Sequence, residues 1–238
     1  MATRITRKQL KTDKFAVEVE HTVDYFAEHQ KDILRYTAIA AVVVVIAVAF
    51  YFYRKHEHSI REQALAEAIQ VQEAPVVQPN SATQPPGPIS FASDDAKRKE
   101  ATKVFTNIAT KYSGSPEGLI AKYYLGAIAA DSGKTAEAEK FFKEAADGSN
   151  KNYASLAKLS LAQIYFADGR QAQGENLLRG LVDHPTDLVT KEQATFALAR
   201  GIAPTKPAEA RKMLEPFRTD AGAVSQLAIS ALSELPGQ

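Results

Sequence analysis

The side chains that could carry out chemistry are few in this sequence, and their spacing does not favour it. His56, Glu57 and His58 are residue types that bind transition metals, but alternate residues of a helix point about 200° apart and do not converge on one ion. Asp94 and Asp95 form an acidic pair directly before a helical pattern, where carboxylates cap a helix and favour its dipole. We therefore predict neither a metal site nor a catalytic pair of carboxylates at these positions.

The sequence signatures of common enzyme classes are also missing. There is no glycine-rich phosphate-binding loop, no His-Glu-x-x-His and no Gly-x-Ser-x-Gly, and the lack of cysteine excludes thiolate chemistry. Lys and Arg number 29 against 28 Asp and Glu, whereas nucleic-acid binding requires a concentrated basic face. We expect a protein that is not an enzyme, holds no cofactor or metal, and binds proteins but no nucleic acid. An enzyme remains the third hypothesis, and a pocket with converging polar side chains would be its mark.

One stretch of the chain is long and apolar enough to cross a membrane. Residues 36–53, between Arg35 and Arg54, are eighteen uncharged and almost wholly apolar residues. As an α-helix they measure about 27 Å, close to the roughly 30 Å hydrocarbon core of a bilayer. A strand is disfavoured because lipid requires backbone groups to pair within the segment. A cleaved signal peptide is disfavoured because the apolar run starts late and no small-x-small cleavage site follows it. We predict a retained transmembrane helix that contacts membrane lipid.

The distribution of basic residues predicts the orientation of this helix. Residues 1–35 carry seven Lys or Arg, whereas residues 54–96 carry three. By the positive-inside rule the N-terminus lies in the cytoplasm and the C-terminal part is exported. The immediate flank Arg54-Lys55 is as basic as the flank on the other side, so the bias comes from the whole N-terminal segment.

The segments around the span have different compositions. Residues 1–35 are interpreted as a cytoplasmic basic tail followed by a helix, which is either solvated or an amphipathic segment that lies on the membrane or docks a partner. Residues 54–72 are rich in helix formers and predict a juxtamembrane helix. Residues 73–92 contain five prolines, which predict an extended spacer that lets residues 93–238 stand off from the bilayer.

The region 93–238 repeats itself. Strand signals are missing, and "LGAIAADSGKTAEAEKFFKEA" (125–145) aligns with "LAQIYFADGRQAQGENLLRGL" (161–181) at an offset of 36. The same offset relates Gly126 to Ala162 and Leu198, Ala138 to Gly174 and Ala210, and Phe142 to Leu178 and Leu214. Small residues recur where helices approach closely and large ones where they fill the gap. The pattern predicts an all-α protein in which the span is followed by a stack of helix pairs.

These positions resemble the tetratricopeptide repeat, a helix-turn-helix unit of about 34 residues. The matches are Leu125, Gly126, Ala138, Phe142 and Ala145 in one unit, and Leu161, Ala162, Tyr165, Gly174, Leu178, Leu181 and Pro185 in the next. A third unit, "FALARGIAPTKPAEARKMLEPF", matches less closely. Ala101, Phe105 and Pro116 indicate a second helix whose first helix was lost to the spacer or replaced by another segment. The resemblance implies a tetratricopeptide-repeat-like α-solenoid.

A solenoid of this kind presents a groove lined by the first helices of its units, which binds peptides or partner proteins. The repeat register places six residues on that groove: Tyr123, Ala127, Asp131, Leu159, Gln163 and Phe166. Tyr123, next to Tyr124, is the foremost candidate for a contact. Leu159 and Phe166 are equally well explained as packing residues.

The whole layout resembles the YfgM-type family of bacterial inner-membrane proteins. This resemblance implies a single-pass protein of the bacterial inner (cytoplasmic) membrane with a periplasmic repeat domain. It further implies an ancillary partner of the Sec translocon that interacts with periplasmic chaperones and newly exported polypeptides. The alternative is a structural adaptor in envelope assembly or cell division, which would bind one fixed protein partner.

Overall fold

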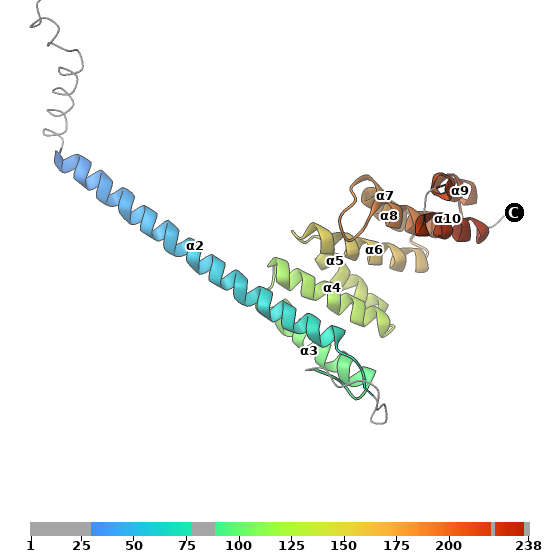
Figure 1. The fold of residues 1–238 in the computed structure, drawn as a ribbon, viewed down its shortest axis with the longest axis horizontal. Helices are drawn as coiled ribbons and strands as arrows, with labels where there is room; N and C mark the ends of the chain where they lie inside the picture. The colour runs from blue at the N-terminus through green and yellow to red at the C-terminus, as the bar shows by residue number, and fades with distance from the viewer. Residues whose placement is uncertain (1–29, 78–88, 220–221, 236–238) are drawn as a thin grey trace, which may run out of the picture. The chain divides into compact units, whose positions relative to one another are not determined.

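The computed structural model describes residues 30–77, 89–219 and 222–235 of the chain. These residues are almost entirely helical, with one isolated β-bridge between Val76 and Phe91, so the prediction of an all-α protein is confirmed (Figure 1). Contacts divide the chain into two compact units, Met1–Ser59 and Ile60–Gln238. The predicted basic tail and its helix lie mostly outside the described residues, as does the centre of the proline-rich segment.

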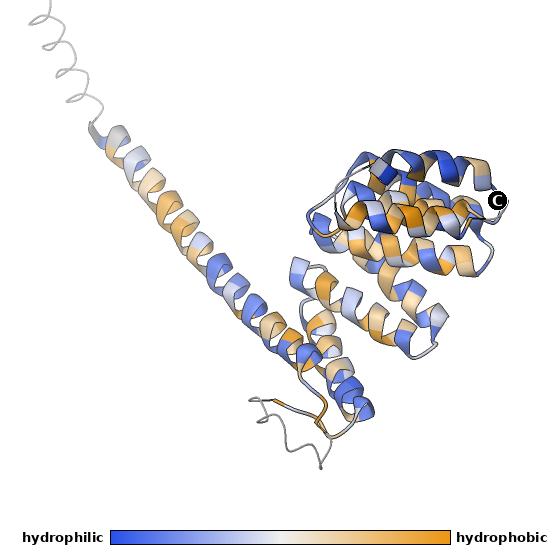
Figure 2. Ribbon diagram, turned by 45° about the vertical axis from the view of Figure 1, so that its right-hand side comes forward, coloured by the Kyte–Doolittle hydropathy of each residue, from blue (hydrophilic) through white to orange (hydrophobic). Residues whose placement is uncertain are grey.

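The first described element is the long helix α2, Gln30–Glu73, of 44 residues. Every side chain from Tyr36 to Tyr53 is exposed, and Figure 2 shows this part of the helix as apolar before it turns hydrophilic. An apolar helix without protein around it is stable only if another apolar medium covers it. By length and composition α2 fits a membrane anchor or a signal sequence.

The second unit is a stack of helices that each pack on the next along the chain. They are α3 Asp94–Lys111, α4 Pro116–Asp131, α5 Thr135–Ala146, α6 Lys151–Ala167, α7 Gln171–Asp183, α8 Lys191–Ile202, α9 Pro207–Leu214, the short 3₁₀ helix η1 Glu215–Thr219 and α10 Ala223–Ser233. Contacts also join α4 to α6 and α6 to α8. The first helices of successive pairs therefore form a row of their own.

Local chemistry explains where these helices begin and end. The side chains of Ser115, Asn150 and Thr190 accept hydrogen bonds from backbone amides of the first turns of α4, α6 and α8, which satisfies donors that have no partner inside a helix. The turns between paired helices contain Gly133 and Gly169 at φ of 73° and 74°, a conformation that costs glycine little. Alternating caps and glycine turns produce the helix-turn-helix units.

The C-terminal end of α2 is the first helix of the stack. Leu65 and Ala68 are buried in one core cluster with Ala101 and Phe105 of α3. The same part of α2 is tied to the first turn of α4, because Arg61 Nε lies 3.3 Å from a carboxylate oxygen of Glu117, which is itself buried. A helix of the juxtamembrane segment thus supplies the partner that α3 requires, and the compact unit begins at Ile60 and not at residue 93.

The proline-rich segment does not separate two bodies. The backbone N–H of Val77 donates to the carbonyl of Phe91 at 2.9 Å, and the N–H of Phe91 donates to the carbonyl of Pro75 at 3.1 Å. Its two ends are therefore held together between the end of α2 and α3, and both of these segments belong to the second unit. The expectation of a spacer that sets the distal domain apart is corrected by this pairing, because a connection with joined ends adds no reach.

Candidate functional site

Three tyrosines from two neighbouring first helices form an aromatic surface, here called the tyrosine cluster: Tyr123 and Tyr124 of α4 and Tyr153 of α6. All three are half-buried. The ring of Tyr123 lies 5.5 Å from that of Tyr124 and 5.6 Å from that of Tyr153, in edge-to-face geometry. Such pairs are favourable beyond the area that they bury. The cluster is a preformed surface held by its own contacts.

Hydrogen bonding and stacking fix the cluster in place. The hydroxyl groups of Tyr124 and Tyr153 lie 3.2 Å apart, and the ring of Tyr124 stacks on buried Phe105 with centroids 4.7 Å apart and planes 8° from parallel. Burial raises the pKa of Tyr124, and the hydrogen bond to Tyr153 raises it further. Burial also raises the pKa of Tyr123. The phenols of Tyr123 and Tyr124 therefore stay neutral, and these two side chains offer hydroxyl groups and ring edges but no charge.

The structure distributes the six residues predicted for the groove among different environments. Tyr123 lies in the tyrosine cluster, and Ala127 one turn later is half-buried against the core. Asp131 and Gln163 are exposed on α4 and α6. Leu159 and Phe166 both pack against the core. These residues lie on one row of helices in different environments, and their role as one contact surface stays a prediction.

Phe166 is held by two glycines. A Cβ atom added to Gly174 would lie 3.0 Å from its ring, and one added to Gly201 would lie 2.3 Å from it. The ring thus fills the space between α6, α7 and α8 that the glycines leave open. This placement favours the packing interpretation of Phe166.

Sequence reasoning missed Tyr153 and the role of Tyr124. Tyr153 lies in the first turn of α6, before the groove positions of the repeat register, and its hydroxyl group meets one that is 29 residues away. The only signal was the type of residue: an additional tyrosine at the start of α6, two helices after the Tyr123-Tyr124 pair of α4.

Ion pairs link the second helices of successive units, and the same pair recurs 36 residues later. This set of ion pairs is called here the ion-pair ladder. Glu139 of α5 accepts two hydrogen bonds of 2.8 Å from Arg170, at the start of α7. Glu175 of α7 accepts bonds of 3.0 and 2.8 Å from Lys206, at the start of α9. Both pairs join a glutamate to a cation 31 residues later.

These contacts shift the titration of the glutamates. Hydrogen bonds from Arg170 and then Lys143 lower the pKa of Glu139 to about 2, and Lys206 and then Arg179 lower that of Glu175. A carboxylate whose pKa is lower in the folded state stabilises the fold above its ordinary pKa. For Glu139 that contribution is lost as the pH falls from 4.5 towards about 2.

No group of three or more metal-ligating side chains comes together among the residues that the structure describes. His56 and His58 lie on α2, and Asp94 and Asp95 occupy the first turn of α3 after the capping residue Ser93. The polar surfaces of the described chain are thus ion pairs and helix caps, and its most distinctive aromatic feature is the tyrosine cluster.

Comparison with known proteins places the fold. Two crystal structures of nearly identical TPR-like repeats, from a Podosopora anserina protein described as a kinesin light chain, match with a TM-score of 0.50 and 16% identity. Each match covers 58% of this chain and 77% of the other, and at this identity the likeness concerns the fold alone. No functionally curated protein shows significant sequence similarity to the chain. The profile of the tetratricopeptide repeat-like domain family TPR_21 matches residues 24–216, which include both the apolar helix and the stack of helix pairs, and the chain therefore belongs to that family.

Proposed function

We propose that this protein is a membrane-anchored scaffold that binds other proteins through the tyrosine cluster on its row of first helices. The repeat itself indicates protein binding, since stacked helix pairs present extended surfaces for partners. The observation that carries the proposal is the cluster: three half-buried tyrosines that contact one another on the first helices α4 and α6. Tyrosine is enriched at protein interfaces because its ring buries a large area and its hydroxyl group finds a partner.

The proposed location follows from α2. Its apolar half has the length of a membrane span, and the basic N-terminal segment favours a cytoplasmic N-terminus with an exported repeat unit. Residues 1–35 would then lie in the cytoplasm and residues 36–53 in the lipid. The family match supports this arrangement, because it begins at residue 24 and so includes the apolar helix together with the repeats.

The partners that we propose are components of protein export. The layout resembles YfgM-type inner-membrane proteins, which implies contacts with the Sec translocon, periplasmic chaperones and exported polypeptides. A half-buried aromatic surface without charge suits segments of chains that are not yet folded and expose apolar side chains. A fixed adaptor for envelope assembly is the other candidate, and it differs in the number and identity of its partners.

Site-specific crosslinking in intact membranes tests the proposal. A photoreactive phenylalanine analogue replaces Tyr123, and the same analogue replaces exposed Lys140 on α5 as the matched control. We expect adducts from position 123 that contain translocon subunits and many exported chains, and few adducts from position 140. Phe166 is left unchanged, because its packing on Gly201 would confuse a loss of binding with a loss of stability.

The possible results separate the candidates. One stoichiometric envelope protein at position 123 would favour the adaptor over the export partner. Equal adducts from both positions would contradict binding at the tyrosine cluster, and so would undiminished partner capture by a folded Tyr123→Ala, Tyr153→Ala variant. Circular dichroism and thermal unfolding of the purified full-length variants establish that they are folded.

A further inference from the structure

The ion-pair ladder lacks its carboxylate at the first position of the stack. In α3 the small residue Ala101 and the large residue Phe105 are completely buried, as are Ala138 and Phe142 at the corresponding positions of α5. The glutamates of the ladder directly follow the small residue in α5 and α7. In α3 that position is Thr102, whose side chain is short and carries no charge.

The cation that would pair with this missing carboxylate is present as Lys134. Lys134 precedes α5 as Arg170 precedes α7 and Lys206 precedes α9, at the constant offset of 36. Its ammonium group lies 3.6 Å from Glu137 on its own helix, and both side chains are more than half exposed. A pair of this kind contributes little. Lys134 therefore pairs on its own helix, whereas its counterparts receive a carboxylate from the preceding second helix.

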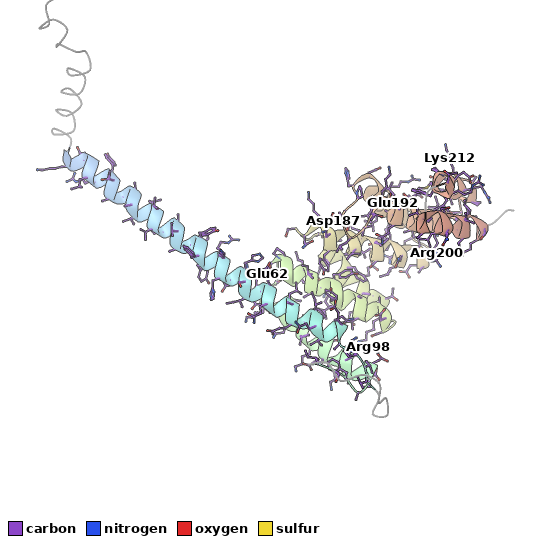
Figure 3. The ribbon with its side chains drawn as sticks, viewed as in Figure 1. Glu62, Arg98, Asp187, Glu192, Arg200 and Lys212 are labelled. Atoms are coloured by element: carbon purple, nitrogen blue, oxygen red, sulfur yellow. The ribbon has the colours of Figure 1, made fainter. Side chains whose placement is uncertain are left out.

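A cleft of about 410 Å³ lies between α3, α4 and α5. Thr102 and Lys134, the two positions at which a first ion pair of the ladder would form, both line this cleft. Thr102 and Thr106 line it in place of the longer ladder side chains, and Leu125, Ile128 and Phe141 contribute apolar lining. Two acids also line the cleft, Asp95 and Glu137. The cations around it are Arg98, Lys99, Lys103 and Lys134, of which Figure 3 labels Arg98 on α3.

We propose that this cleft binds an acidic peptide segment of a partner protein, whose carboxylate takes the place of the missing glutamate next to Lys134. The volume suits a few side chains. The four cations of the lining exceed its two acids. Arg98, Lys103 and Lys134 pair with Asp95, Glu100 and Glu137 on their own helices, but these pairs are exposed and hold their cations weakly, so the cleft can attract an anion. Carboxylates that meet Lys and Arg in recessed sites form short, charge-assisted hydrogen bonds, as Glu139 does with Arg170 at 2.8 Å.

The shape and charge of the cleft favour a peptide over an anionic membrane surface. Asp95 and Glu137 lie among its lining residues, and Asp94 and Glu100 lie with Asp95 on α3. These acids repel a flat anionic surface over its whole area, whereas a flexible peptide can place its carboxylates between them, next to the cations. The apolar lining gives a neighbouring side chain of the peptide a place to pack. This site shares α4 with the tyrosine cluster, but none of the three tyrosines lines it, so either proposal stands without the other.

Fluorescence anisotropy of the full-length chain in neutral detergent tests the site. The probe is a labelled peptide of alternating Glu and Ala, and its counterpart has Gln in place of Glu. We expect saturable binding of the Glu peptide that weakens with salt, and much weaker binding of the Gln peptide. Thr102→Glu supplies the missing carboxylate from within, so it should reduce affinity by at least about tenfold.

Matched variants distinguish this cleft from general electrostatics. Thr110→Glu adds the same charge to an exposed position of α3 outside the cleft and should change affinity by less than about twofold. Thr102→Val keeps the space open without a charge and should preserve binding. Lys134→Gln should weaken binding of the Glu peptide. Because Lys134 is exposed, this variant should still fold. Thr102→Glu should also raise the melting temperature, because the new carboxylate pairs with Lys134.

Three results would overturn the proposal. The first is the absence of saturable binding of the Glu peptide. The second is an equal loss of affinity in Thr102→Glu and Thr110→Glu, which would mean that net charge alone attracts the peptide. The third is loss of peptide binding when the wild-type chain is placed in nanodiscs rich in phosphatidylglycerol, while binding persists in neutral nanodiscs. That result would assign the cleft to lipid.

Discussion

At the scale of single residues, close packing between glycines and aromatic rings sets the spacing of the helices. Gly126 faces the ring of Phe142, where an added Cβ would lie 2.7 Å from a ring carbon, and Gly201 faces Phe166 even more closely. Protein interiors are packed densely enough that one extra methyl group is felt. The recurring small positions of this sequence are thus requirements of helix contact.

The substitution Gly201→Ala tests this contact. Its Cβ would lie 2.3 to 2.6 Å from ring atoms of Phe166, so overpacking should destabilise the fold by about 1–3 kcal/mol, less any gain in helix propensity. Gly180→Ala on α7 is the control, because nothing lies within 4 Å of its added Cβ, and it should stabilise by up to about 1 kcal/mol. Urea unfolding of the full-length chain measures both. Equal stabilisation by the two changes would mean that the ring moves freely.

At the scale of helices, the main finding is that α2 supplies the first helix of the repeat stack. Repeat units cannot bury their apolar faces alone, and without α2 the core around Phe105, which also stacks on Tyr124 of α4, would lose Leu65 and Ala68. The partner precedes the proline-rich segment in the chain, whereas every other pair of helices is joined by a short turn. The proline-rich segment is therefore an insertion within a helix pair, with its ends joined by the Val76–Phe91 bridge.

Leu65→Ala tests the contribution of this helix to the stack. Leu65 is 8% exposed in the cluster with Phe105, and truncation of a buried leucine typically costs about 2–5 kcal/mol. We expect a loss of about 2–4 kcal/mol in unfolding free energy. Leu188→Ala is the control, because Leu188 is 41% exposed, and it should cost less than about 1 kcal/mol. Similar costs for both variants would show that α2 packs only loosely on α3.

At the scale of the whole molecule, one helix combines two tasks. Its first part exposes an apolar surface, and its last part packs one face against α3 and α4, with Leu65 and Ala68 buried. A continuous helix leaves no unpaired backbone groups between the two parts, which lipid and the interfacial layer would penalise. The apolar stretch and the first helix of the stack are thus consecutive parts of α2.

Membrane extraction tests the anchor. We expect the full-length chain to stay with the membrane after an alkaline wash, and protease added to the exported side to digest the repeat unit. The double variant Val44→Arg, Val45→Arg should be released, because each arginine at the centre of a span costs about 3 kcal/mol. Val44→Leu, Val45→Leu is the matched control and should remain bound. A mature chain shortened at its N-terminus would identify a cleaved signal sequence, and digestion from the cytoplasmic side would reverse the orientation.

The sequence by itself determined the helical class, the apolar stretch 36–53 and the repeat at an offset of 36, because periodicity and hydropathy are local properties of a chain. It also proposed Tyr123 as a contact residue, because a repeat register assigns each residue to a face, and that role stays a prediction. Only the tertiary structure decided that α2 pairs with α3, that Tyr153 meets Tyr124, that Phe166 packs between glycines and that Thr102 and Lys134 border a cleft. The reason is that these features depend on contacts between distant segments, and alanine-rich helices such as the end of α2 carry weak local signals of the partner they bury against.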